Sequence, residues 1–184
     1  MNRVRIIGGT WRSRLLALPA GVAGLRPTPD RVRETLFNWL GQNLMGLACL
    51  DLFAGSGALG FEAASRGAAS VTLVERDARA CAALRRNAAA LPAAQVEIVQ
   101  GDAVDFLRST RRLFDIAFVD PPYRQERIER IVALLDRSMR PAGRIYAEAE
   151  ATLAEEAGWC VTRRGRAGQV HFHLMERAAS DSCP

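Results

Sequence analysis

Five short apolar runs alternate with helical segments over most of the chain. The runs have the length of strands and are nearly continuous in apolar residues, which is typical of strands covered on both faces. They are 47–54, 70–75, 95–100, 114–120 and 143–149. Ala-rich segments with helical patterns lie between them, at 58–66, 78–91, 103–110 and 125–139. This alternation predicts βαβ units, a parallel sheet and right-handed crossovers.

The two ends of the chain follow other patterns. Near the C-terminus, two alternating stretches flank the segment RGRAGQ, which predicts an antiparallel hairpin at the edge of the sheet. Near the N-terminus, arginines alternate with apolar residues around Gly8 and Gly9, which predicts a small twisted hairpin with a basic face that carries Trp11. Residues 28–30, TPD, then mark the start of an amphipathic helix.

These patterns divide the chain into three parts. Residues 1–46 are predicted to form a basic hairpin and helix, residues 47–177 an α/β domain, and residues 178–184 a flexible tail. A length of 184 residues, 49% of them hydrophobic, suits one globular domain with a small extension. The longest apolar runs are interrupted well short of the roughly 20 residues that a membrane span needs. We therefore expect a soluble, cytoplasmic protein that does not contact membranes and is a monomer.

The positive charge is concentrated near the N-terminus. Residues 1–40 hold seven arginines and two acids, whereas the rest of the chain holds 18 of each, so the net charge of +5 lies in the first fifth. A basic segment on a neutral domain is typical of nucleic-acid binding, because cations neutralise phosphates and release counterions. A solubilising arm is the alternative. The four cysteines and two histidines have no metal-ligand spacing, so no metal site is expected.

A glycine-rich loop follows the first strand of the α/β domain. The segment DLFAGSGALG places Gly55, Gly57 and Gly60 in G-x-G-x-x-G spacing before a helix. The same spacing occurs in dinucleotide sites. Asp51, however, lies inside the strand, where a dinucleotide site is normally apolar. A carboxylate there suits a ligand that carries an ammonium and a sulfonium group, which favours S-adenosylmethionine.

Four acids lie at four consecutive strand ends. They are Asp51, Glu75, Asp102 and Asp120. The carboxyl ends of parallel strands meet at one rim, where open α/β sheets bind their ligands. Asp102 could accept the exocyclic amine of adenine. Each acid alone could instead be a helix N-cap or a surface carboxylate, but the four together favour a cofactor site.

The fourth of these strands ends in DPPY, residues 120–123. The two prolines fix two φ angles and remove two backbone donors, so this corner is stiff and its carbonyls face outward. A carboxylate and an aromatic ring flank it. A simple turn is the alternative interpretation.

With these motifs the chain resembles a known group of enzymes. Residues 47–176 are similar to the class I S-adenosylmethionine-dependent methyltransferases, and within them to the D/N-P-P-Y/F enzymes that methylate amino nitrogens. The segments RIIGGTWRSRLLALP and GLRPTPDRVRETLFNWL are similar to the small-subunit (16S) ribosomal RNA guanine-N2 methyltransferases, the RsmD family. The resemblance implies a Rossmann-like sheet of seven strands, mostly parallel with the last strand antiparallel. It also implies methylation of a guanine N2 in 16S ribosomal RNA, in an assembling subunit.

The resemblance assigns roles to matching positions. Those for the cofactor are Asp51, Gly55, Gly57, Glu75 and Asp102, with Glu75 on the ribose hydroxyls. Those for catalysis are Asp120, Pro121 and Tyr123. The Asp120 carboxylate and the Pro121 carbonyl would accept the two N–H groups of the amine, and Tyr123 would stack on the base. Asp120 would also take up the departing proton. Those for RNA are Arg3, Arg5, Trp11, Arg12, Arg14 and Arg26.

Other targets remain open at this point. The DPPY motif alone also fits adenine N6 in nucleic acid or the amide of a glutamine side chain. An RNA-binding module that keeps the cofactor fold without turnover is the alternative outside enzymes.

Overall fold

The computed structural model describes residues 3–18, 22, 27–122, 128–154 and 157–178. Its centre is a seven-stranded sheet with the order β5-β4-β3-β6-β7-β9-β8. The strands are β3 (Ala48–Asp51), β4 (Ser70–Glu75), β5 (Val96–Gln100), β6 (Phe114–Val119), β7 (Met139–Ala149), β8 (Trp159–Ala167) and β9 (Val170–Arg177). Strands β3 to β7 pair in parallel, and β9 pairs antiparallel with both β7 and β8. The predicted α/β class and the seven-stranded sheet with an antiparallel last strand are confirmed.

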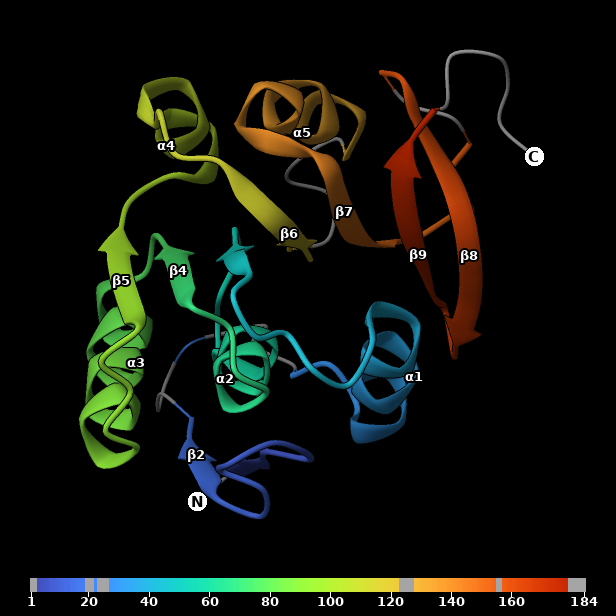
Figure 1. Ribbon diagram of the computed structural model, residues 1–184. Helices are drawn as coiled ribbons and strands as arrows, with labels where there is room; N and C mark the ends of the chain where they lie inside the picture. Colours follow the sequence, from blue (N-terminus) through green and yellow to red (C-terminus); the bar gives the residue numbers. More distant parts are fainter. Residues whose placement is uncertain (1–2, 19–21, 23–26, 123–127, 155–156, 179–184) are drawn as a thin grey trace.

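Helices cover both faces of this sheet (Figure 1). On one face lie α1 (Asp30–Leu40), α2 (Ala58–Ser65) and α3 (Ala78–Ala90). On the other lie α4 (Ala103–Ser109) and α5 (Ile128–Leu135), which continues into a 3-10 turn over Asp136–Ser138. Each face has its own apolar core, and side chains of β6 alternate between them: Phe118 enters the first and Val119 the second. No helix in the described ranges is long and apolar enough to cross a membrane.

The predicted boundaries differ from the structure mainly at β7. This strand begins at Met139, where a helix was expected to end, and not at residue 143. Its pairing with β6 shifts register between Phe114 and Ile116, so β7 carries extra residues that include Pro141. The sequence pattern missed this irregular stretch because a proline near the end of a helical segment indicates a helix stop, not a strand.

The predicted N-terminal hairpin is present and forms a further layer outside the helices. Strands β1 (Arg3–Arg5) and β2 (Leu15–Ala17) pair antiparallel and lie beyond α2 (Figure 1). The buried side chain of Asn87, on α3, accepts a hydrogen bond from the Ala17 N–H and donates one to the Ala17 carbonyl, each at 3.0 Å. This amide acts as a strand partner for β2 and fixes the hairpin to α3.

The loop of the hairpin closes on the end of α2. The Thr10 N–H donates to the Ser65 carbonyl at 2.7 Å, and the Trp11 N–H donates to the Ser65 hydroxyl at 2.9 Å. Gly9 has a φ of +74°, and a Cβ there would lie 1.9 Å from the Ser65 carbonyl oxygen. Any side chain at this position would force the loop off the helix.

Glu62, on α2, joins the hairpin to two helices through a fully buried carboxylate. It accepts hydrogen bonds from the N–H groups of Ile7 and Gly8 at 2.8 and 2.7 Å. It also pairs with the guanidinium groups of Arg33, on α1, and Arg66. Arg33 is itself fully buried and also donates to the Arg5 carbonyl. Arg33 belongs to the basic N-terminal segment of the sequence, but it is inside the protein and cannot contact phosphates.

We predict that Glu62→Ala strongly destabilises the fold. The substitution removes the carboxylate that pairs with two buried guanidinium groups and leaves two backbone N–H groups without their acceptor, which costs about 3–5 kcal/mol. Chemical denaturation measures the free energy of unfolding. Glu34→Ala is the matched control, because Glu34 is exposed on α1, and it should change that free energy by no more than about 0.5 kcal/mol. Equal effects of the two substitutions would contradict this account of Glu62.

Candidate active site at the carboxyl edge of the sheet

The glycine-rich loop connects β3 to α2 and depends on backbone conformations that favour glycine. Gly55 has a φ of +50°, and Gly57, the N-cap of α2, has a φ of +76°. A Cβ on Gly57 would lie 2.6 Å from the side chains of Phe61 and Leu84. The loop therefore turns tightly, and its backbone lies at the carboxyl edge of the sheet.

Asp51 is the last residue of β3 and lies buried beneath this loop. Its Oδ2 accepts a hydrogen bond from the Gly60 N–H at 3.1 Å. Burial raises the pKa of Asp51 from 3.8 to about 7; the charge of Glu75 adds to this rise, and hydrogen bonds from the backbone oppose it. Ionised Asp51 is thus costly in the protein alone, and a cationic ligand beside it would favour the ionised form.

Glu75 and Asp102 follow on the next two strands of the sheet. Glu75 ends β4, and its two oxygens accept hydrogen bonds from the N–H groups of Gly55 and Asp77, each at 2.8 Å. Asp102 is exposed and is the N-cap of α4: its Oδ1 accepts from the N–H groups of Val104 and Asp105. The N-cap alternative raised from the sequence thus describes Asp102 correctly.

Asp120 follows β6, on the other side of β3. Burial raises the pKa of Asp120 well above its ordinary value, and the charges of Glu148 and Asp51 raise it further. Pro121, next in the chain, is half-buried. Tyr123 lies outside the described residues.

Glu148, on β7, extends the row of acids and was not predicted. Its buried carboxyl accepts a hydrogen bond from the Tyr146 hydroxyl at 2.9 Å, and the Thr28 side chain also hydrogen-bonds to it. The sequence held a signal for it, because an acid interrupts the apolar strand IYAEA just as Asp51 interrupts its own strand.

The strand order places these five acids side by side in a sequence that differs from their order in the chain. Across the sheet they are Asp102, Glu75, Asp51, Asp120 and Glu148. The chain passes from β3 to β4 and β5 on one side and places β6 and β7 on the other. The reversal lies between β3 and β6, where open α/β sheets form their binding crevice. Asp51 and Asp120 lie on the two sides of this crevice.

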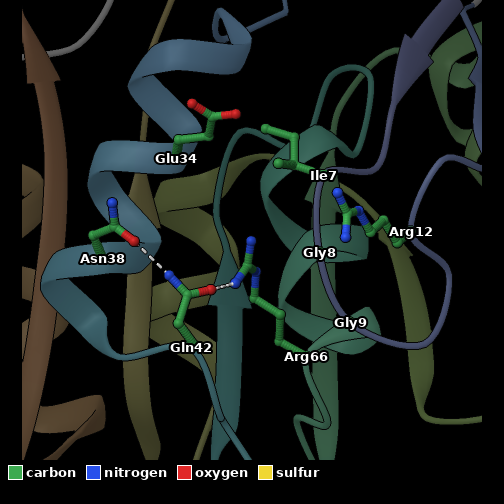
Figure 2. A pocket seen from close by; sticks show the side chains of 8 residues that line it. All are labelled: Ile7, Gly8, Gly9, Arg12, Glu34, Asn38, Gln42 and Arg66. Atoms are coloured by element: carbon green, nitrogen blue, oxygen red, sulfur yellow. Dashed lines mark hydrogen bonds between the residues drawn. The ribbon is translucent and has the colours of Figure 1, made fainter.

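Three of the residues predicted to bind RNA line two different grooves. Arg3 and Arg5 line a groove of about 490 Å³ between the hairpin and the segment Pro27–Asp30. Arg12 lines a second groove of about 490 Å³, together with Glu34 and Asn38 of α1 and with Arg66, just past the end of α2 (Figure 2).

The remaining predicted RNA residues have other surroundings. The Arg14 guanidinium donates to the Ala90 carbonyl at 3.1 Å. Trp11 is half-buried against the apolar core. Arg26 lies outside the described residues. Within the described part of the chain, no group of three or more His, Cys, Asp or Glu side chains could hold a metal ion.

Comparison with known proteins identifies the family. A family model described as Conserved hypothetical protein 95 matches residues 4–176. The Ribosomal RNA small subunit methyltransferase D of Escherichia coli is 44% identical over 183 residues, which cover 97% of this chain and 92% of the relative. The chain belongs to the RsmD family of methyltransferases.

Solved structures agree with this assignment. The structure of Escherichia coli yhhF is 44% identical, has a TM-score of 0.87, and the match covers 97% of this chain and 100% of that one. The methyltransferase fold of the RsmD family thus extends over nearly the whole chain. SMU.776, solved in complex with SAH, shares the fold at a TM-score of 0.66 and 18% identity, over 79% of this chain and 48% of that one.

We predict that Asp51→Asn changes how stability depends on pH. The folded-state pKa of Asp51, about 7, lies above the ordinary value of 3.8. Its contribution to stability is therefore complete below about pH 4 and is lost as the pH rises towards 7, at roughly 1.4 kcal/mol per pH unit. The variant lacks this loss, so its free energy of unfolding should rise relative to that of the wild type between about pH 4 and 7, and the difference should level off above pH 7. Denaturation curves at several pH values measure the difference.

The matched control for this experiment is Asp105→Asn, since the Asp105 side chain is 78% exposed. The difference between its free energy of unfolding and that of the wild type should stay constant over the same pH range. A constant difference for Asp51→Asn as well would contradict the raised pKa.

Proposed function

We propose that this chain transfers a methyl group from S-adenosylmethionine to the exocyclic N2 amine of a guanine in small-subunit ribosomal RNA, in an assembling subunit. The observation that carries the proposal is the row of acids at the carboxyl edge, where Asp51 and Asp120 flank the switch point beside a glycine-rich loop. The name of the Escherichia coli relative supports ribosomal RNA of the small subunit as the substrate.

The residues at the rim fit this cofactor chemically. When bound, S-adenosylmethionine supplies a methyl group on a positively charged sulfonium. Asp51 offers a buried negative charge to the cationic part of the cofactor. Glu75, fixed by two backbone N–H groups, has lone pairs left for ribose hydroxyls, and Asp102 Oδ2 can accept the adenine amine. A neighbour with the same fold binds SAH, which supports the assignment.

The DPPY corner provides acceptors for the amine. The lone pair of the guanine N2 is delocalised into the ring, so the nitrogen attacks poorly until its protons are held. The Asp120 carboxylate and the Pro121 carbonyl can hold one proton each, which orients the lone pair towards the methyl group. Asp120 can then accept a proton as the nitrogen becomes positive. The base must leave its stack to reach this rim, and Tyr123 would offset part of that cost.

The groove beside Arg3 and Arg5 is the best candidate for RNA contact near the site. Its lining includes Thr28, whose side chain hydrogen-bonds to Glu148 in the row of acids. A phosphate backbone in this groove would therefore lie next to the rim. Arg12 is further away, because its groove also includes Arg66, just past the end of α2 that faces away from the glycine-rich loop. In this proposal residues 1–46 act as the RNA-binding extension of a methyltransferase domain formed by residues 47–177.

We predict that Asp120→Ala abolishes most methyl transfer. Loss of a positioned proton acceptor should lower the rate by about 10²–10⁴-fold, while cofactor binding, measured by calorimetry, persists. The assay is transfer of a labelled methyl group to small-subunit ribosomal RNA or to partly assembled subunits. Asp105→Ala, at an exposed position near the same rim, is the matched control and should keep wild-type activity.

The product identifies the acceptor atom. Digestion of the methylated RNA to nucleosides, followed by chromatography and mass spectrometry, should yield N2-methylguanosine. N6-methyladenosine would redirect the proposal to adenine, and methylation of a protein glutamine without RNA methylation would replace it. A wild-type protein that binds RNA and cofactor but never turns over would support a binding module.

We predict that Arg3→Gln/Arg5→Gln weakens RNA binding and reduces its dependence on salt. Each lost phosphate contact should lower the slope of log affinity against log salt by about 1. The matched control is Arg108→Gln/Arg130→Gln, since these exposed arginines lie on α4 and α5, across the sheet from the hairpin. An equal loss of slope in both double variants would show that the contribution is one of net charge and not of this groove.

A further inference from the structure

Glu148 lies in the row of acids, but the proposed methyl transfer gives it no role. The residue is 8% exposed, and its carboxyl has two hydrogen-bonding neighbours, the Tyr146 hydroxyl and the Thr28 side chain. Both neighbours are themselves buried. A carboxyl in such a place costs stability, because burial disfavours its charge.

The register of the sheet brings Glu148 next to Asp120. In the parallel pairing of β6 with β7, Phe118 lies opposite Tyr146 and Val119 opposite Ala147. One residue further, Asp120 comes opposite Glu148. Opposite residues of neighbouring strands lie about 5 Å apart and point to the same face of the sheet. The two carboxyls are therefore direct neighbours.

The surroundings of this pair contain further acids and few other titratable groups. Asp51 faces it from β3, and Tyr146 faces it from β7. From β9, the residue opposite Glu148 is Phe172, whereas the histidines 171 and 173 alternate to the other face. Thr28 approaches from the segment before α1. No arginine of the described ranges forms an ion pair with either carboxyl.

We propose that Glu148 is a positioning residue for methyl transfer: it forms a carboxyl pair with Asp120, and its negative charge makes Asp120 a stronger base towards the substrate amine. The proposal rests on the function proposed above. Two neighbouring carboxyls in a buried site share one proton more readily than they carry two charges. In agreement with this geometry, burial and then the charge of Glu148 raise the pKa of Asp120, and burial also raises the pKa of Glu148.

The pair supplies the proton acceptor that the reaction needs. The amine nitrogen forms a bond to the methyl carbon while the carbon–sulfur bond breaks and its electron pair returns to sulfur. The nitrogen, now positive, loses one proton to the Asp120 carboxylate. The resulting carboxylic acid can donate a hydrogen bond to ionised Glu148 and later releases its proton to water. Tyr146 and Thr28 keep Glu148 in place throughout.

We predict that Glu148→Gln shifts the acidic limb of the pH–rate profile to lower pH by about 1 to 2 units. The amide still accepts a hydrogen bond from Tyr146, so the change removes charge and keeps shape. Asp120 then loses its proton more easily but is a weaker base, so the plateau rate should fall several-fold. Glu148→Asp, which keeps the charge, should retain a limb near that of the wild type. Glu176→Gln, at an exposed position on β9, is the matched control and should change neither quantity.

A second measurement needs neither cofactor nor turnover. In the protein alone, carbon-13 NMR of labelled carboxyl groups should show Asp120 and Glu148 titrating together in two steps more than one pH unit apart. In Glu148→Gln, Asp120 should titrate once, at lower pH. The wild-type titration tests the pair even where the variant does not fold, which thermal unfolding would reveal.

The outcomes separate the two proposals. The role of Glu148 is overturned if the wild type is active and folded Glu148→Gln has the same acidic limb and the same Asp120 titration as the wild type. Independent single-step titrations in the wild type also overturn it. A wild type that transfers no methyl group to an RNA amine overturns the proposed function instead, and the NMR result then still decides whether the carboxyl pair exists.

Discussion

The buried carboxylate of Glu62 is the contact on which the arrangement of the N-terminal segment depends. Two backbone N–H groups of the hairpin and two guanidinium groups all point to this one side chain. Each partner would be costly inside the protein alone, so only the docked arrangement satisfies all of them. The hairpin is thus fixed to α2, the helix whose other end carries the glycine-rich loop. The basic hairpin therefore has a fixed position relative to the candidate site, unlike a flexible arm.

The acids of this protein divide by the charges around them. Glu62 lies between two arginines, and its negative charge is compensated, which suits a structural role. Asp51, Asp120 and Glu148 lie in a row at the sheet edge, and burial raises the pKa of all three. Such uncompensated carboxyls destabilise the protein alone and become useful when a cation or a proton arrives. The stability given up at the rim is therefore consistent with a site that binds a cationic cofactor and accepts a proton.

Most of the fold and part of the candidate site could be predicted from local sequence. Strand ends and glycine spacing located Asp51, Glu75, Asp102 and Asp120, because parallel strands bring their carboxyl ends together. Long-range pairing is not written in local patterns, so the partnership of Glu62 with the hairpin was not foreseen. Net charge does not distinguish Arg33 from the surface arginines, although Arg33 lies one turn from apolar Leu36 and Phe37 on the buried face of its helix.

Glu148 is harder to predict than the neighbouring acids because it does not end its strand. It lies one residue before the end of β7. The extra residues of β7 near Pro141 alter the pairing with β6 at its start. The register that follows the irregularity sets Ala147 opposite Val119, and so Glu148 opposite Asp120. Because Thr28 hydrogen-bonds to Glu148, the same register connects the start of α1, and the groove beside Arg3 and Arg5, to the carboxyl pair. If RNA binds in that groove, as proposed, it contacts the segment whose Thr28 holds one member of the proposed pair.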